Sequence, residues 1–316
     1  MFKPKTTSET NEENYKKQQK GRKKDTQNEI RAHPLLNYIY RFMGMVFQRN
    51  DERESQLNGY DIKLFFRGLS YIVDEKADTK RRLCLGVGNV LNLREAACTF
   101  CYECSFLYYF KRGIEYVVQR WLGWGAETRR ATALNSHYML IWMDFDTNDK
   151  GLITRIRQIE ILFISHEQWW SIIQKAFPGK KPSDISKEAL DKIPANADWS
   201  KSLRVKLEGC GNDEAYVVIS LQLVECPVNV ITSKKALREH AEWAYAFNVN
   251  YEVGQEMSEC VEDVISSWRP TKQLPNMPKQ IFNEGGWYPP SEWDAVHNRS
   301  YKEWRQIMKT KWQKPA

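Results

Sequence analysis

Long apolar runs are missing from this sequence. Charged side chains interrupt every hydrophobic stretch before it reaches the roughly 20 residues that a membrane-spanning helix needs. The first thirty residues are polar and contain no apolar core of a secretory signal. We therefore expect an intracellular protein, cytoplasmic or nuclear, with no transmembrane segment.

The pattern of a disulfide framework is also missing. The 316 residues include seven cysteines, an odd number at scattered spacing, and such thiols stay reduced in a protein that is not secreted. Cys98, Cys101 and Cys104 have zinc-like spacing, and Cys84 would be a fourth ligand. We expect the first three to lie inside a helix, whereas zinc ligands at this spacing lie on a tight turn. The prediction is structural thiols and no metal.

Complete catalytic motifs are missing as well. The sequence has no P-loop, no nucleophile elbow and no His-Glu-x-x-His, and Gly86-Val87-Gly88 lacks the third glycine of a dinucleotide site. This absence favours a protein that is not an enzyme and that uses no cofactor.

One pair of carboxylates nevertheless has the spacing of a metal site. Asp144 and Asp146 end an apolar strand, so both point to one face, as Mg²⁺ ligands in phosphoryl-transfer enzymes do. A third ligand would have to come from Glu160, Glu208 or His166. The simpler interpretation is turn chemistry, because Asp, Asn and Gly are the residues that a hairpin turn requires. A metal-dependent nuclease or nucleotidyl-transfer enzyme that uses Asp144 and Asp146 stays an alternative.

Basic charge and aromatic rings are what the sequence has in excess. The net charge is +7 and 13% of the residues are aromatic, which favours a polyanionic partner such as nucleic acid or an anionic membrane surface. Residues 1–32 are nearly free of apolar side chains, so we expect them to form a disordered basic arm. Its basic cluster, the candidate nucleic-acid-binding site, consists of Lys16, Lys17, Lys20, Arg22, Lys23 and Lys24.

The rest of the chain predicts an α+β fold in which antiparallel β-hairpins pack with amphipathic helices. Residues 33–127 are expected to be mainly helical, with one helix over 34–49 and a long one over 92–121. Within this region, residues 69–73 and 82–85 favour a pair of strands.

Residues 128–269 contain two segments of the same layout. Residues 138–177 and 203–247 each predict strand, turn, strand and helix. We interpret the two segments as a ββα pseudo-repeat. A further amphipathic helix is expected over residues 253–268.

The C-terminal end is rich in proline and then in aromatic residues. Residues 270–290 predict an extended linker, and residues 291–316 predict an amphipathic helix. We expect this helix to dock on the body of the protein, on a second subunit or on a membrane. Its aromatic stripe and the basic charge beside it include Trp293, Tyr301, Trp304, Lys309 and Trp312.

A basic arm before a compact aromatic body, followed by a linker and a terminal helix, is a common layout of proteins that coat nucleic acid. Viral nucleocapsid, coat, matrix and movement proteins share it, which is an analogy of layout and not of descent. We therefore expect a non-enzymatic structural protein that binds nucleic acid, either RNA or DNA, and self-associates into a homo-oligomer. The alternatives are the metal-dependent enzyme and a peripheral, matrix-like protein on an anionic membrane.

Overall fold

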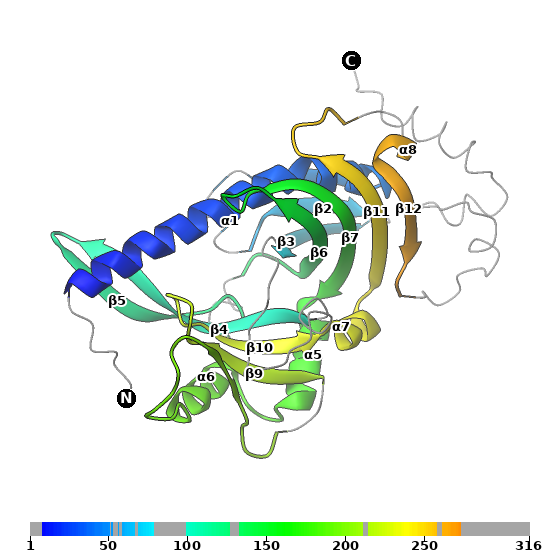
Figure 1. The fold of residues 1–316 in the computed structure, drawn as a ribbon. Helices are drawn as coiled ribbons and strands as arrows, with labels where there is room; N and C mark the ends of the chain where they lie inside the picture. The colour runs from blue at the N-terminus through cyan, green and yellow to red at the C-terminus, as the bar shows by residue number, and fades with distance from the viewer. Residues whose placement is uncertain are drawn as a thin grey trace. The chain divides into compact units, whose positions relative to one another are not determined.

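The protein has an α+β fold, as expected, with one seven-stranded and one five-stranded sheet, both largely antiparallel (Figure 1). The chain divides into two compact units, each containing one sheet: unit 1 is residues 1–27, 78–133 and 164–241, and unit 2 is residues 28–77, 134–163 and 242–316. The computed structural model describes residues 8–50, 52, 56, 59–66, 69–78, 99–126, 133–210, 214–257 and 261–272.

Unit 2 contains the seven-stranded sheet, in the order β1-β2-β3-β6-β7-β11-β12. Helix α1 (Ser8–Phe42) contributes its C-terminal part to this unit. The other elements are β1 (Val46–Arg49), β2 (Ile62–Phe66), β3 (Leu69–Asp78), β6 (His137–Thr147), β7 (Ile153–Ser165), β11 (Trp243–Glu252), α8 (Val261–Val264) and β12 (Ile265–Pro270).

The core of unit 2 forms where the last turns of α1 pack on the sheet. Leu35, Leu36, Ile39 and Met43 are fully buried, at the spacing of one helix face. They belong to a single cluster with strand residues such as Ile141. The expected apolar face of this segment is therefore confirmed.

The limits of that helix differ from the prediction. Helix α1 continues through Pro34 instead of starting there. Pro34 is exposed, so water can reach the carbonyl that loses its N–H partner. The helix ends at Phe42, Gly44 turns the chain with φ 76°, and the next residues pair as β1 with β2. A helix extending to Arg49 was therefore wrong.

The expectation of a disordered arm is wrong for residues 8–32, because they form the first part of α1. The composition argument counted only apolar burial. Three amide side chains in this segment are buried instead, namely Asn11, Gln18 and Asn28. Residues 1–7 lie outside the described part of the chain.

Unit 1 contains the five-stranded sheet, in the order β5-β4-β10-β9-β8. Its elements are the N-terminal part of α1, β4 (Thr99–Arg112), β5 (Glu115–Leu122), α5 (His166–Ala176), α6 (Pro182–Asp191), β8 (Ser202–Val205), β9 (Ala215–Ser220), β10 (Val228–Ser233) and α7 (Lys234–His240).

A cluster of large rings lies in the core of unit 1. Trp169 is fully buried, and its ring centroid lies 5.3 Å from those of both Tyr102 and Trp124. Its indole N–H donates to Thr232 Oγ1 at 3.1 Å, which satisfies the one polar group of the side chain. Gly125 has to be glycine, because a Cβ there would lie 2.3 Å from the Tyr102 ring. Trp169 is therefore a core residue, and the half-buried Trp124 packs against it.

The predicted long helix over residues 92–121 is wrong where the structure describes it. Residues 99–112 and 115–122 form the hairpin β4–β5, with a continuous register from Ser105 opposite Leu122 to Arg112 opposite Glu115. Gly113 has φ 62° at the first position of the two-residue turn, where type II′ hairpins favour glycine. Aromatic residues on both faces of β4 hide the alternation that would have indicated a strand.

The expected helix over residues 253–268 is also wrong. Only residues 261–264 are helical, and Ile265–Pro270 pairs with β11 as the edge strand β12. Val264, Ile265 and Trp268 are buried, as the apolar pattern indicates. A short apolar segment of this kind fits either a helix or a strand, so periodicity alone did not decide.

The first predicted strand–turn–strand–helix segment matches β6, β7 and α5. Helix α5 begins with a capping box of Ser165 and Gln168. The second segment contains an additional strand, β10, and its helix α7, which Ser233 caps, is shorter than predicted. The end of the predicted helix is wrong, because β11 begins at Trp243. The strands of the two segments lie in different sheets, and a common origin of the segments stays a prediction.

Residues 273–316, which include the predicted linker and terminal helix, lie outside the described part of the chain. Among the helices of the described residues, none is long and apolar enough to span a membrane.

Candidate nucleic-acid interface

Residues 8–27 of α1 lie against the β4–β5 hairpin of unit 1 (Figure 1). The amide of Gln18 donates to the Leu107 carbonyl at 3.0 Å and accepts from the Tyr109 N–H at 3.3 Å. It therefore pairs with the backbone of β4 as a residue of a neighbouring strand would. Asn11 donates to the Tyr116 carbonyl at 3.0 Å. Polar contacts thus hold a helix segment that has little apolar surface to bury.

Asn28 makes the same type of contact within unit 2. Its amide donates to the Gly151 carbonyl at 3.2 Å and accepts from the Ile153 N–H at 2.9 Å. The Arg31 guanidinium donates to the Ile153 carbonyl at 3.0 Å. Each of these bonds pairs a backbone group at the start of β7 or in the turn that precedes it.

We expect Gln18→Leu to release residues 8–27 from the hairpin. The substitution leaves the Leu107 carbonyl and the Tyr109 N–H unpaired, at a cost of about 1–3 kcal/mol for each group that stays buried. Amide hydrogen exchange in residues 8–27 should accelerate about 10- to 100-fold, as measured by mass spectrometry. Gln27→Leu, at an exposed position of the same helix, is the control and should change little. Equal exchange in both variants would show that Gln18 does not hold the segment.

The basic cluster of α1 is exposed and mostly lies on one side of the helix. At 3.6 residues per turn its five lysines span about 120° of the circumference, opposite the face that contains Gln18. They cover about 12 Å along the helix axis. We call this surface the lysine face; its residues are Lys16, Lys17, Lys20, Lys23 and Lys24, all of them exposed.

Most charges of the lysine face are uncompensated. Lys16 pairs with Glu12 at 2.8 Å, and the hydrogen bond and charge of that carboxylate raise the pKa of Lys16. Within the described part of the chain, the other four lysines have no ion-pair partner. Arg22, the sixth residue of the predicted cluster, points elsewhere: its guanidinium carbon lies 4.9 Å from the ring centroid of Tyr108. The prediction missed this separate role.

The ring that Arg22 contacts belongs to a row of aromatic side chains on the β4–β5 hairpin. Tyr108 stacks on Phe110 with centroids 5.8 Å apart, and it lies 4.3 Å from Trp121 and 6.4 Å from Phe106. The row is half-buried to exposed, and Trp121 is 40% exposed. We call it the aromatic ladder. Sequence reasoning missed it, because in a helix Phe106, Tyr108 and Phe110 would not share a face.

No family model, curated protein or solved structure matches this chain. Its function therefore has to be argued from these surfaces alone.

The two candidate catalytic aspartates face a guanidinium. Arg157 on β7 donates to both oxygens of Asp144, at 3.1 and 3.2 Å, and also bonds Asp146. These hydrogen bonds raise the pKa of Arg157, whose positive charge stands where a metal ion would neutralise the pair. The neighbouring turn has the predicted chemistry: the Asn148 side chain accepts from two backbone N–H groups, and Gly151 has φ 69°.

The proposed third ligands do not complete a metal site in the described residues. No group of three His, Cys, Asp or Glu side chains there could hold a metal ion. Glu160 accepts from the Thr271 hydroxyl at 3.0 Å instead. Glu208 lies in unit 1 and His166 begins α5.

The candidate zinc cysteines are placed differently from the prediction. Cys101 and Cys104 lie in strand β4 and not in a helix. Cys104 is buried, with its thiol 3.8 Å from the Tyr102 carbonyl. Cys98 and Cys84 lie outside the described residues, as do the predicted partner or membrane residues Trp293, Tyr301, Trp304, Lys309 and Trp312.

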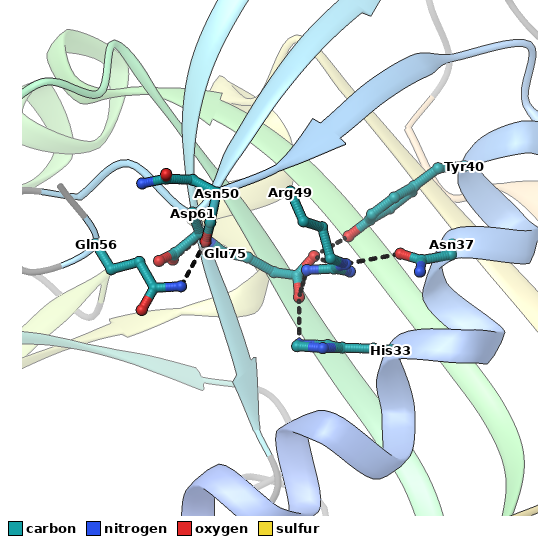
Figure 2. Close-up of polar contacts among 8 residues, drawn as sticks. All are labelled: His33, Asn37, Tyr40, Arg49, Asn50, Gln56, Asp61 and Glu75. Atoms are coloured by element: carbon teal, nitrogen blue, oxygen red, sulfur yellow. Dashed lines mark hydrogen bonds and ion pairs between the residues drawn. The ribbon is translucent and has the colours of Figure 1, made fainter. Parts of the chain in front are cut away.

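A partly buried polar cluster lies in unit 2, between α1 and β1–β3 (Figure 2). At its centre the Glu75 carboxylate accepts from Arg49, at 3.2 and 3.3 Å, and from the Tyr40 hydroxyl, at 2.7 Å. Arg49 also donates to Asn37 at 2.7 Å, and His33 lies 3.8 Å from Glu75. Burial works against the charge on Arg49, yet Glu75 holds its pKa above the ordinary value.

A second pair of carboxylates adjoins this cluster. Asp61 accepts from the Glu75 N–H at 2.9 Å, and Asp74 pairs with Lys76 at 2.6 Å. Burial, followed by the negative charge of Asp74, raises the pKa of Asp61 to about 7. Each of the two cations, Arg49 and Lys76, has a carboxylate partner, Glu75 and Asp74 respectively. The contacts of the cluster are therefore those of a structural network. Sequence reasoning missed it, because its members come from four short segments with no common motif.

Proposed function

We propose that this protein binds nucleic acid through the lysine face of α1. The observation that supports the proposal best is the placement of five exposed lysines on one side of a helix whose other side is bonded to the β4–β5 hairpin. Over about 12 Å, duplex DNA carries about seven phosphate charges, so the charge densities of the two surfaces are comparable. Because the helix is ordered before binding, the lysines lose less conformational freedom than those of a disordered arm would.

Nucleic acid fits this surface better than a membrane does. A helix that binds in the membrane interface needs an apolar face opposite its basic face. In residues 8–27 the opposite face contains the amides Asn11, Asn14 and Gln18, and all three are bonded to the hairpin. The segment therefore has no free apolar side to insert.

The wider role we propose is that of a non-enzymatic coating protein that self-associates. The support for this part is the layout of the sequence, with its aromatic C-terminal segment. The pairing of Asp144 and Asp146 with Arg157 gives no support to the alternative of a metal-dependent enzyme.

The test is a binding titration of the full chain with all five lysines of the lysine face changed to glutamine. Fluorescent single-stranded RNA, single-stranded DNA and duplex DNA are titrated at several salt concentrations. We expect the variant to lose about 100-fold in affinity at physiological salt and the slope of log K against log salt to fall by about 3–5. The control variant removes the same charge from exposed lysines elsewhere in unit 1, with glutamine at Lys175, Lys181, Lys187, Lys206 and Lys235.

Equal losses in the two variants would mean that only net charge matters, and the lysine face would not be the site. Absence of binding by the unmodified protein at low salt would overturn the proposal altogether. In that case, co-sedimentation with anionic vesicles is measured. If the unmodified protein sediments with the vesicles and the lysine-face variant does not, the lysine face binds a membrane.

A further inference from the structure

We infer that the aromatic ladder of the β4–β5 hairpin stacks unpaired bases, so that the nucleic acid bound is single-stranded. This inference rests on the proposed function, because it supplies the base contacts that accompany phosphate contacts at the lysine face. Bases stack on aromatic side chains irrespective of sequence, and proteins that bind single strands combine such rings with a basic surface.

The ladder occupies one face of the hairpin in an unbroken row. Residues 106, 108 and 110 alternate with residues whose side chains point to the other face, and Trp121 lies directly opposite Phe106 on β5. On the other face, Tyr109 is buried and bonded to Asn14 of α1. The ladder face is thus the side of the hairpin that α1 leaves accessible, and its most exposed ring is Trp121.

Positive charge lies next to the ladder, and Glu115, opposite Arg112 on β5, offsets part of it at the end of the hairpin. Arg22 lies over Tyr108 at one side, and Arg112 follows Phe110 on the same face of β4. The exposed Lys111 adds charge at the end of the hairpin. Guanidinium groups next to rings can bind the phosphates of a strand whose bases are stacked.

The ladder and the lysine face are joined within unit 1. Arg22 contacts the ladder, and the next residue, Lys23, belongs to the lysine face. One flexible strand can therefore place bases on the rings and phosphates on the lysines. A duplex keeps its bases paired and stacked inside, so it can use only the charged part of this surface.

The same charges disfavour a second copy of this chain as the occupant of the ladder. Two copies that met through this face would bring together Arg22 and Arg112 of each subunit. Such like-charge contacts oppose association unless anions intervene. A polyanion with planar, apolar faces matches both the charge and the rings.

The experiment uses the full chain with the double substitution Tyr108→Leu and Trp121→Leu. Its affinity for single strands and for duplexes of the same length is compared with that of the unmodified protein. We expect the affinity for single strands to fall about 10- to 100-fold, while the affinity for duplex DNA changes less than about twofold. Trp199→Leu is the control, because Trp199 is 42% exposed elsewhere in unit 1. Unchanged duplex binding shows at the same time that the double variant is folded.

A second measurement does not depend on that variant. Oligonucleotides carrying 5-iodouracil are bound to the unmodified protein and photocrosslinked to it. We expect the crosslinked residues to lie within residues 106–121. Equal losses for single strands and duplexes, or adducts only outside the hairpin, would overturn the inference and leave the lysine face in place. The molecular mass of the unmodified protein in solution could also rise with concentration. If the double variant abolished that rise but bound nucleic acid normally, the ladder would be a self-association surface and the inference would be wrong. Failure of the proposed function would look different, because neither type of probe would bind.

Discussion

Glu75→Gln is expected to lower the free energy of unfolding of unit 2 by about 3–5 kcal/mol, the usual cost of removing one member of a buried ion pair. The Glu75 side chain is 6% exposed and that of Arg49 is 18% exposed. Glutamine has nearly the same shape as glutamate, but it has no charge and one acceptor oxygen instead of two. The Arg49 guanidinium would then remain buried without a counter-ion, and the Tyr40 hydroxyl would compete with it for the remaining oxygen.

The change is measured by urea denaturation followed by circular dichroism, with hydrogen exchange to assign the loss to unit 2. Glu239→Gln is the control, because Glu239 is 53% exposed and lies 4.0 Å from Lys235. An exposed pair of this kind contributes less than about 1 kcal/mol. A double-mutant cycle with Arg49→Met should give a large coupling energy. A loss below about 1 kcal/mol for Glu75→Gln would show that the cluster does not stabilise unit 2.

The parts of the fold that could be predicted are those with strong local patterns. Hairpin β6–β7 has a polar turn between two apolar strands, and the capping residues Ser165 and Ser233 mark the helices that follow strands. Local rules suffice there because the neighbouring residues provide the hydrogen bonds. The α+β class follows from such segments.

The hairpin β4–β5 could not be read in the same way. Its residues Cys104 and Leu107 fit helical spacing, although Phe106, Tyr108 and Phe110 equally fit one face of a strand. Rings on both faces make the two patterns overlap. Gly113 was the signal that could have decided, because a glycine inside a predicted helix costs about 1 kcal/mol relative to alanine.

The sequence predicted which basic residues form the candidate site, but not that an ordered helix presents them on one side. The basic cluster could be read from the sequence, whereas the order of the helix could not. It depends on Gln18 and Asn28, whose partners lie 89 to 125 positions away in the chain. No local pattern indicates that an amide will pair with the backbone of a distant strand. The aromatic ladder could not be predicted either, because its rings share a face only if β4 is a strand.

The stability of unit 2 is expected to fall as the pH rises from about 4 to about 7, through the titration of Asp61. The folded protein holds the proton of this carboxyl with a pKa of about 7, whereas the unfolded chain releases it near 3.9. Between these values the folded state binds more protons, so the free energy of unfolding decreases with pH. For a shift of about three units, the change is at most roughly 4 kcal/mol. The cause is the burial of Asp61 beside Asp74, which makes its negative charge unfavourable.

Asp61→Asn removes this dependence, because asparagine keeps an acceptor for the Glu75 N–H and cannot ionise. Below pH 4 the two proteins should have similar stability, and near pH 8 the variant should be the more stable one. Burial lowers the pKa of His33, and the charge of Asp61 is one of those that oppose this shift. The two proteins are therefore compared in a His33→Gln background, where His33 makes no contribution. Asp198→Asn is a control of opposite sign: hydrogen bonds from Ser200 lower the pKa of Asp198 to about 2, so the stability that Asp198 contributes is present at neutral pH and is lost on acidification. Urea denaturation at one-unit steps from pH 2 to pH 8 measures all three proteins, and parallel curves for the unmodified protein and Asp61→Asn would show that Asp61 ionises normally in the folded state.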